Sequence, residues 1–538
     1  MKSMPAWLAA ATFAAAAIAA PSALAQAGSS ASPAISVDAQ ASGPVISREI
    51  FGQFVEHLGN GVYGGIWVGK DSAIPNVRGI RSDVVTALRA IKVPVVRWPG
   101  GCFADQYNWR HGIGPADQRV ATVNMWGNVV EPNTFGTDEY LDFVDQIGSE
   151  AYVSVNVGSG TPAEAAAWLE YMTTDQPSTL GKLRAANGHP APYRIKYLGI
   201  GNENWGCGGG MSADEYVSEM KRFGSFTRNL NPAQNGVVPF VRSPDAMRQI
   251  AVGPGDDKTD YTEAVMKAWT QKAPYSWDID GISLHYYTGG KAGVLQSPST
   301  GFGEDDYAAS IRNTLKMEQL IAANSAVMDK YDPQKKIALM VDEWGIWTAP
   351  MPGTNFMFMR QHGSLRDGIL AALNFNIFVR HAERVRMANI AQMANVIHSL
   401  ILTDGAKMLL TPTYHVHRLY LPFQDAHRLV VTFTPGSYRA GEIALPQVDG
   451  IAARTKDGTV WLAVTNLDAA RTVDLGAQVH GMATRSAVGE VLTAPAVDAI
   501  NTYAKPDVVA PRPVRFSAQG GKLMLRLPPH SVTVVRLQ

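Results

Sequence analysis

The 538-residue sequence contains little cysteine and no excess of charge of either sign. Lys plus Arg and Asp plus Glu both number 47, so the formal net charge is zero. A nucleic-acid-binding surface needs a basic excess, and we therefore predict neither a nucleic-acid nor a membrane partner. The cysteines are Cys102 and Cys207, too few for a disulfide framework. The sequence leaves open whether they are bonded to each other.

Several signatures of other protein classes are also missing. No HExxH motif or similarly tight set of ligands occurs, so we predict no catalytic metal. Phe51-Gly52-Gln53-Phe54 supplies no Gly-rich fingerprint after the first strand candidate, which argues against a nucleotide-binding doubly wound sheet. Beyond the N-terminus, no apolar run reaches the roughly 20 residues that a membrane-spanning helix needs.

Residues 1–25 have the pattern of a secretory signal peptide. A positive start precedes an Ala-rich apolar run at 7–20, and Ala23-Leu24-Ala25 fits the small-x-small cleavage pattern. The alternative is a membrane anchor, but the run is shorter than the roughly 20 residues required. We therefore predict cleavage, a secreted or periplasmic location, and a flexible leader at 26–34.

Between residues 49 and 400, apolar strand-like runs alternate with helical runs. Several of the strand candidates are apolar almost throughout, which is typical of parallel strands buried on both faces. We predict a (β/α)8 TIM barrel here, with an open doubly wound sheet as the alternative. The strand candidates are Phe51–Glu56, Val93–Trp98, Ala151–Val157, Ile195–Ile200, Ile250–Gly253, Ile279–His285, Ile337–Val341 and Met387–Gln392.

Helix starts and a change of pattern complete the predicted organisation. Thr161 and Ser212 are each followed three residues later by Glu, which predicts two capped helices. Longer helical patterns cover 307–331 and 365–381. Residues 401–538 change to short alternating runs separated by Gly, Pro and Asp, which predicts a C-terminal antiparallel β-sandwich that strands at 35–48 join.

Two glutamates follow predicted strands that face each other across the barrel mouth. Glu203 comes after the fourth strand and Glu343 after the seventh, and each precedes a Trp within two residues. Catalytic groups of such barrels lie at the carboxyl ends of the strands, and glycosidic hydrolysis needs two carboxylates flanking one bond. We predict that Glu203 is the acid/base and Glu343 the nucleophile. The alternative is that both are ordinary polar residues at strand ends.

Further polar and aromatic groups fall at the same predicted level and would suit a sugar pocket. Some have a simpler interpretation: Arg97 can pair with a buried carboxylate, His57 can be a structural histidine, and both cysteines can be plain buried thiols. These groups are Glu56, His57, Arg97, Cys102, Asp105, His285, Tyr286, Tyr287, Gln392 and Asn395.

These motifs together resemble the α-L-arabinofuranosidases of glycoside hydrolase family 51, over essentially the whole chain after the signal peptide. Each motif alone is weak, but their order is specific. They are Phe54-Val55-Glu56-His57-Leu58-Gly59, Arg97-Trp98-Pro99-Gly100-Gly101-Cys102, Glu131-Pro132-Asn133-Thr134-Phe135-Gly136, Gly201-Asn202-Glu203-Asn204-Trp205-Gly206-Cys207, His285-Tyr286-Tyr287, Asp342-Glu343-Trp344 and Gln392-Met393-Ala394-Asn395.

The resemblance implies a retaining double displacement without a cofactor, releasing terminal arabinose from arabinoxylan, arabinan or their oligosaccharides. It places His285 and Arg97 behind the catalytic carboxylates. Cytoplasmic relatives typically form hexamers, so a homo-oligomer is one expectation. The residues that it implies around the sugar are Glu56, Cys102, Asn202, Tyr287 and Gln392, with Trp126 and Trp344 as pocket walls.

Two other functions remain as alternatives. The same fold and chemistry can act on β-xylosides or β-glucans, because a fold does not fix the substrate. A non-catalytic carbohydrate-binding protein is disfavoured because both carboxylates are present with their flanking residues.

Overall fold

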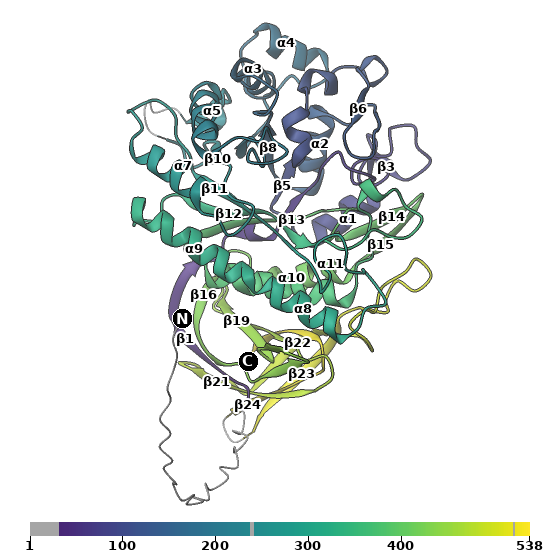
Figure 1. The fold of residues 1–538 in the computed structure, drawn as a ribbon, viewed down its shortest axis with the longest axis vertical. Coiled ribbons are helices and arrows are strands. Elements are labelled where there is room, and N and C mark those ends of the chain that lie inside the picture. Colours follow the sequence, from purple (N-terminus) through teal and green to yellow (C-terminus); the bar gives the residue numbers. More distant parts are fainter. Residues whose placement is uncertain (1–31, 237–241, 520–521) are drawn as a thin grey trace, which may run out of the picture. The chain divides into compact units, whose positions relative to one another are not determined.

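The computed structural model describes residues 32–236, 242–519 and 522–538 of the chain (Figure 1). The predicted signal peptide, and residues 26–31 of the predicted leader, lie outside the described residues. Within the described ranges, no helix combines the length and the apolar character that crossing a membrane requires.

Eight strands form a closed parallel barrel, so the predicted (β/α)8 fold is confirmed. Each strand overlaps one of the predicted strands, and their order around the barrel follows the chain. A cluster of buried side chains, including Val95, Tyr152 and Met387, forms one of the cores of this part of the chain. The strands are β2 (Gly52–Phe54), β5 (Val95–Trp98), β8 (Glu150–Val155), β9 (Tyr197–Ile200), β10 (Arg248–Ala251), β11 (Gly281–Thr288), β12 (Ala338–Ile346) and β13 (Val385–Ala391).

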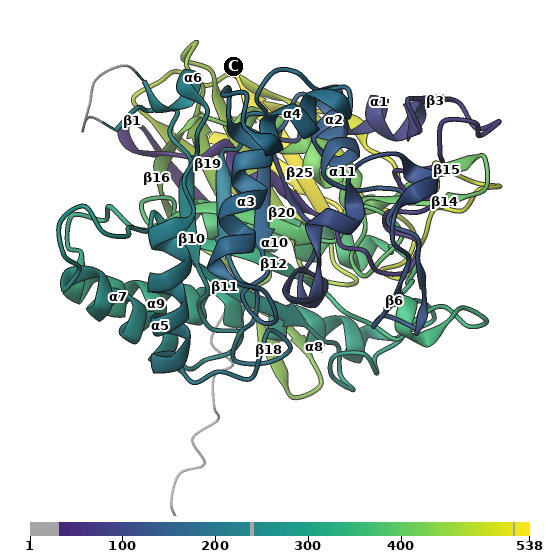
Figure 2. The same cartoon turned by 90° about the horizontal axis from the view of Figure 1, so that it is seen from above.

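Helices connect the strands, and α3, α5, α7 and α9 contact one another in succession on the outside of the barrel (Figure 1 and Figure 2). Both predicted caps form: the side chains of Thr161 and Ser212 accept hydrogen bonds from the backbone N–H three residues on. The helix predicted at 307–331 is instead divided into two at Leu315. The helices are α1 (Ser82–Ala90), α2 (Thr137–Ile147), α3 (Pro162–Thr173), α4 (Thr179–Ala186), α5 (Ala213–Phe226), α6 (Pro232–Asn235), α7 (Asp260–Thr270), α8 (Glu304–Thr314), α9 (Lys316–Tyr331), α10 (Leu365–Arg380) and α11 (Pro412–Leu419).

The C-terminal part is a sheet domain with its own core, built from antiparallel strands except for one parallel pair, β1 with β21. Its strands close into a ring. The limits proposed from the sequence, 49–400 for the barrel and 401–538 for the sheet domain, remain predictions. In order around the ring, the strands are β1 (Ala34–Val45), β16 (His427–Thr434), β19 (Val448–Arg454), β20 (Val460–Asn466), β25 (Ser531–Leu537), β22 (Ser486–Leu492), β23 (Arg512–Gln519), β24 (Lys522–Leu527) and β21 (Val473–His480).

Helix α10 joins the two parts, because it contacts β12 and β13 of the barrel as well as β19, β20 and β25 of the sheet domain. Nearly all of its residues are buried, which explains why the sequence is apolar around most of this helix. Short hairpins and 3-10 turns complete the fold: β3–β4 (Asn76–Val77, Ile80–Arg81), β6–β7 (Thr122–Asn124, Val129–Glu131), β14–β15 (Ile401–Asp404, Lys407–Leu410), β17–β18 (Tyr438–Ala440, Ile443–Leu445), and the 3-10 helix η2 (Cys102–Gln106).

Candidate active site

A cavity of about 520 Å³ opens where the barrel strands end. It is surrounded by segments that follow most of the strands, as a site at the carboxyl ends of a parallel barrel should be. The structure brings together in its lining nine of the residues that the sequence singled out: Glu56, Cys102, Trp126, Glu203, His285, Tyr286, Tyr287, Glu343 and Gln392.

Glu203 follows β9 in an unusual backbone conformation. Its φ is +42°, in the left-handed region, which costs a residue with a Cβ atom roughly 1–2 kcal/mol. The preceding Gly201 also has positive φ, and a side chain there would meet Asn204 Oδ1 at 2.2 Å. The turn therefore requires glycine at this point, and the neighbouring contacts must stabilise the strained Glu203.

Glu343 lies on β12 and is nearly buried. Arg97 Nη1 donates a hydrogen bond to its carboxylate at 2.6 Å, and the Tyr287 hydroxyl donates another at 2.8 Å. Burial lowers the pKa of Arg97, but the negative charges of Asp342 and Glu343 outweigh burial and raise the pKa above its ordinary value. The guanidinium therefore stays charged. A side chain at Gly101 would come within 2.9 Å of Glu343 Oε1, so this glycine gives the carboxylate its space.

His285 lies close to three carboxylates, those of Glu203, Asp342 and Glu343. Its Nδ1 lies 2.9 Å from Glu203 Oε1, and its Nε2 lies 3.1 Å from Asp342 Oδ1. Burial lowers the pKa of His285, but the surrounding Glu343, Asp342 and Glu203 raise it to about 10. Asp342 also accepts a bond from the Tyr152 hydroxyl at 2.7 Å. Burial raises the pKa of Asp342, but Arg97 and His285 outweigh burial and hold it below its usual value.

This imidazolium should make the stability of the protein depend on alkaline pH. The folded pKa of about 10 exceeds the ordinary value of 6.5, so the stabilisation is complete below pH 6.5 and is lost as pH rises through about 10. We expect the free energy of unfolding of the wild type to fall between these pH values more steeply than that of His285→Asn. Denaturant titrations across the range measure both curves.

The control for that experiment is His480→Asn, which removes an exposed histidine in the sheet domain. Its curve measures how far the loss of an exposed histidine alone changes the pH dependence. Parallel curves for the wild type and His285→Asn would show that His285 carries no extra proton in the folded protein.

Glu56 forms another part of the cavity wall with Trp126 and Gln392. Its Oε1 accepts bonds from the Phe103 N–H at 2.9 Å and from Trp126 Nε1 at 3.0 Å, and its Oε2 lies 3.3 Å from Gln392 Nε2. Burial raises the pKa of Glu56 to about 7 despite these donors. This wall therefore offers a carboxyl and a carboxamide, both suited to hydroxyl groups.

Two predicted positions differ from expectation. Trp344 was expected to wall the cavity, but its indole is fully buried against Phe375 and Phe378 of α10. Successive side chains of a strand point to opposite faces, so the residue after Glu343 turns away from the cavity. Asn202 is also buried rather than lining the cavity, and its Oδ1 accepts a 2.6 Å bond from Arg97 Nη2.

Other aromatic residues line the cavity without having been selected from the sequence. Trp347, three residues after Trp344, stands edge-on to Tyr287 with ring centroids 5.0 Å apart. Trp205 is 37% exposed at the rim and donates from Nε1 to Gly253 O. The only signal for either was an aromatic residue soon after a strand-end glutamate, and this signal does not say which tryptophan faces inward.

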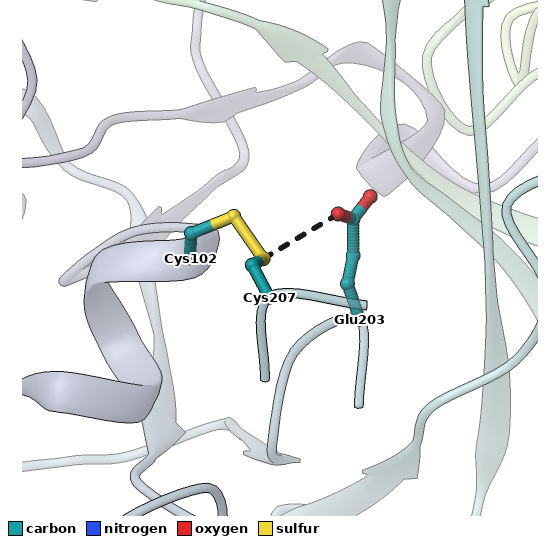
Figure 3. A group of neighbouring side chains, drawn as sticks. All are labelled: Cys102, Glu203 and Cys207. Carbon is teal, nitrogen blue, oxygen red and sulfur yellow. Dashed lines mark hydrogen bonds between the residues drawn. A yellow bond between two sulfur atoms is a disulfide. The ribbon is translucent and has the colours of Figure 1, made fainter. Parts of the chain in front are cut away.

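Cys102 and Cys207 form a disulfide bond, which settles the question that the sequence left open. Figure 3 shows the bridge beside Glu203, with Cys207 Sγ 3.7 Å from Glu203 Oε2. A disulfide sulfur carries no hydrogen, so this is a close contact rather than a bond donated by sulfur. Cys102 thus lines the cavity as half of a disulfide and not as a thiol.

The best-placed candidate metal ligands in the described ranges are Glu203, His285 and Glu343, whose ligand atoms lie within 4.8 Å of one another. Both ring nitrogens of His285 already bond to carboxylates, and a protonated imidazole has no lone pair to offer. The arrangement therefore suits proton transfer better than metal binding.

Two close carboxylates at the mouth of a (β/α)8 barrel, among aromatic and hydrogen-bonding groups, define a glycoside hydrolase. Family models described as "Alpha-L-arabinofuranosidase 1 domain" and "Alpha-L-arabinofuranosidase C-terminal domain" match residues 87–280 and 342–531. The chain belongs to the α-L-arabinofuranosidases of glycoside hydrolase family 51.

Individual relatives cover nearly the whole chain. An intracellular exo-α-L-arabinofuranosidase from Bacteroides ovatus is 39% identical over 94% of this chain and 96% of its own length. The solved structure of a GH51 arabinofuranosidase from Xanthomonas axonopodis pv. citri has a TM-score of 0.88 and 46% identity, covering 94% and 100% of the two chains. An α-L-arabinofuranosidase from Thermotoga maritima, solved with arabinose, has a TM-score of 0.80 and 29% identity, covering 94% and 99%.

The predicted location is corrected by one of these relatives. The sequence predicted a secreted or periplasmic protein from the pattern of residues 1–25, yet the Bacteroides ovatus relative is described as intracellular. The prediction is therefore wrong by this comparison. An N-terminal apolar pattern is a short local signal, whereas the match to this relative extends over 94% of the chain.

Proposed function

We propose that the enzyme is an exo-acting, retaining α-L-arabinofuranosidase that releases terminal L-arabinofuranose from arabinoxylan, arabinan or derived oligosaccharides. The observation that carries the mechanism is the closeness of the two carboxylates, which offer oxygen atoms within 4.8 Å of each other. Retaining glycosidases separate the carboxyl groups by about 5–5.5 Å, whereas inverting enzymes need about 6.5–9.5 Å to admit a water.

In the first step, a carboxylate oxygen of Glu343 attacks the anomeric carbon while the bond to the leaving oxygen breaks. Glu203 transfers its proton to that oxygen, and a covalent glycosyl-enzyme remains on Glu343. Arg97 and Tyr287 donate to the Glu343 carboxylate and fix its orientation for attack. Fixed geometry of this kind is a large part of what a site contributes to rate.

In the second step, the Glu203 carboxylate takes a proton from water as the water oxygen attacks the anomeric carbon. The ester bond to Glu343 breaks, and arabinose leaves with its original configuration. The Glu203 side chain is 19% exposed, the most exposed of the linked carboxylates Glu203, Asp342 and Glu343, which suits a group that must meet water. The contact between His285 Nδ1 and Glu203 Oε1 fixes the orientation of the Glu203 carboxyl group.

Other groups of the lining suit binding of the sugar itself. Glu56, Gln392 and the disulfide half Cys102 line the same cavity as the two carboxylates, and we assign them to the furanose ring. Trp126 and Trp347 also line the cavity and offer aromatic surface to a sugar. The name of the Bacteroides ovatus relative, an exo-α-L-arabinofuranosidase, supports exo action.

A panel of substrates tests the proposal. Aryl α-L-arabinofuranoside should be cleaved faster than aryl β-xyloside or soluble β-glucan, and NMR of the first product should show the α anomer. Faster cleavage of the xyloside or the glucan would contradict the proposed substrate and support the alternative substrates, β-xylosides or β-glucans. A β anomer as first product would exclude the retaining mechanism.

A further inference from the structure

Asp105 is a buried carboxylate that the proposed mechanism does not use. It lies in η2, is 2% exposed and does not line the cavity. No salt bridge to Asp105 occurs in the described ranges, so no side-chain cation within 4.0 Å compensates its burial. Burying an ionised group without a paired cation is costly unless hydrogen bonds replace its water.

Four donors supply those hydrogen bonds. Asp105 Oδ1 accepts from the N–H groups of Val157 and Gly158, each at 2.7 Å. Its Oδ2 accepts from the Asn202 N–H at 2.8 Å and from Asn204 Nδ2 at 3.5 Å. One carboxylate thus ties η2 to the segments that follow two neighbouring barrel strands, β8 and β9.

The two residues held by Oδ2 stand on either side of Glu203. Glu203 has positive φ, and surrounding contacts must maintain such a conformation. The same turn is crowded, because a side chain at Gly208 would approach Asp105 Oδ2 at 2.5 Å and Asn202 O at 2.0 Å. The Asp105 carboxylate therefore occupies the position from which the conformation of this turn is controlled.

The disulfide ties the same two segments at another point. Cys102 belongs to η2, and Cys207 lies four residues beyond Glu203 (Figure 3). The disulfide restrains the far side of the turn, whereas Asp105 bonds to the residues adjacent to Glu203. The two ties can therefore be tested separately.

We propose that Asp105 is a positioning residue for Glu203, holding the backbone on both sides of it so that its carboxyl meets the leaving oxygen. This rests on the proposed acid/base role of Glu203. Its four donors all require an acceptor, which the ionised form of the carboxyl group provides at both oxygens. Burial raises the pKa of Asp105 to about 7, although the bonds from Gly158, Asn202 and Val157 lower it. Asparagine at position 105 has nearly the same shape but presents an N–H₂ group to one pair of these donors.

The test compares two arabinofuranosides that differ in how much acid assistance they need. For Asp105→Asn, kcat/KM on an alkyl arabinofuranoside should fall about 10- to 100-fold, the scale of a misplaced catalytic group, while KM changes little. On a dinitrophenyl arabinofuranoside, whose leaving group departs without a proton, kcat/KM should change little. In a Glu203→Gln background, Asp105→Asn should have no further effect on either substrate.

The matched control is Asp138→Asn, another buried aspartate, whose partners are the hydroxyls of Tyr171 and Tyr193. It should leave the ratio of the two kcat/KM values unchanged. If Asp105→Asn does not fold, Asn204→Ala removes the side-chain donor to Asp105, together with its 2.6 Å bond to Gly208 O, and should shift the ratio in the same direction. The Cys102→Ser/Cys207→Ser double variant reports separately on the disulfide.

Equal losses on both substrates, or additive losses with Glu203→Gln, would overturn the positioning role. Failure of the proposed function has a different signature. In that case Glu203→Gln itself would lack the dependence on the leaving group, whatever Asp105→Asn does.

Discussion

Replacing Glu343 by alanine is expected to reduce kcat by at least about 10⁴-fold, the scale on which loss of a catalytic nucleophile acts in other enzymes. Arg97 and Tyr287 hold this carboxylate by hydrogen bonds. The other carboxyl groups of the cavity lining are those of Glu56, Glu203, Asp256 and Asp257, and in the described ranges none of them bonds to either donor. Without Glu343 no glycosyl-enzyme can form. Single-turnover kinetics on a dinitrophenyl arabinofuranoside would measure the loss.

Adding azide distinguishes the loss of a nucleophile from general damage to the site. A small anion fits the space left by the carboxylate and can attack the anomeric carbon directly, so Glu343→Ala with azide should yield the arabinosyl azide of inverted configuration. Glu343→Gln keeps the shape and should remain inactive with azide. Substantial turnover by Glu343→Gln would remove Glu343 from the reaction.

Replacing Glu203 by alanine should lower kcat/KM on an alkyl arabinofuranoside about 10²- to 10⁴-fold, the usual contribution of general acid catalysis. The loss should be far smaller on a dinitrophenyl arabinofuranoside, because that leaving group needs no proton. Hydrolysis of the glycosyl-enzyme should then become slow, and the intermediate should accumulate on Glu343. Intact-protein mass spectrometry would detect it as one added pentosyl unit.

Azide again separates the roles. With Glu203→Ala, azide attacks the glycosyl-enzyme from the side normally taken by water, so the product should keep the configuration of the substrate. Inverted azide from this variant, or equal losses on both substrates, would contradict an acid/base role. Glu215→Ala is a suitable control, since this glutamate caps α5 on the surface.

The barrel could be predicted because its strands are local and apolar. Runs such as Tyr197–Ile200 are buried on both faces, and this leaves an uninterrupted apolar pattern in the sequence. The break at Leu315 could not be predicted, because the helical pattern continues on both sides of it. The hairpin β14–β15 and helix α11 were missed for a related reason: their patterns are too short to distinguish from sandwich strands.

The two central glutamates could be predicted from their places at strand ends, but their environment could not. Which tryptophan faces the cavity depends on the register of β12, and its pairing with β13 is irregular between Val341 and Trp344. The disulfide joins residues 105 positions apart, and the bonds of Asp105 join residues 52 to 99 positions apart. Such contacts depend on tertiary structure and leave no periodic trace in the sequence.

The place of β1 in the sheet domain bears on how the chain is made. Ala34 pairs with Thr434 on one side and with Gly476 on the other, so this early strand has only late partners. During synthesis β1 stays unpaired until the whole barrel has been made, because its partners come later in the chain. Contacts so distant in sequence also form slowly. An open strand offers its backbone N–H and C=O groups to other chains. The interval before β16 and β21 appear is therefore when newly made chains are most exposed to aggregation.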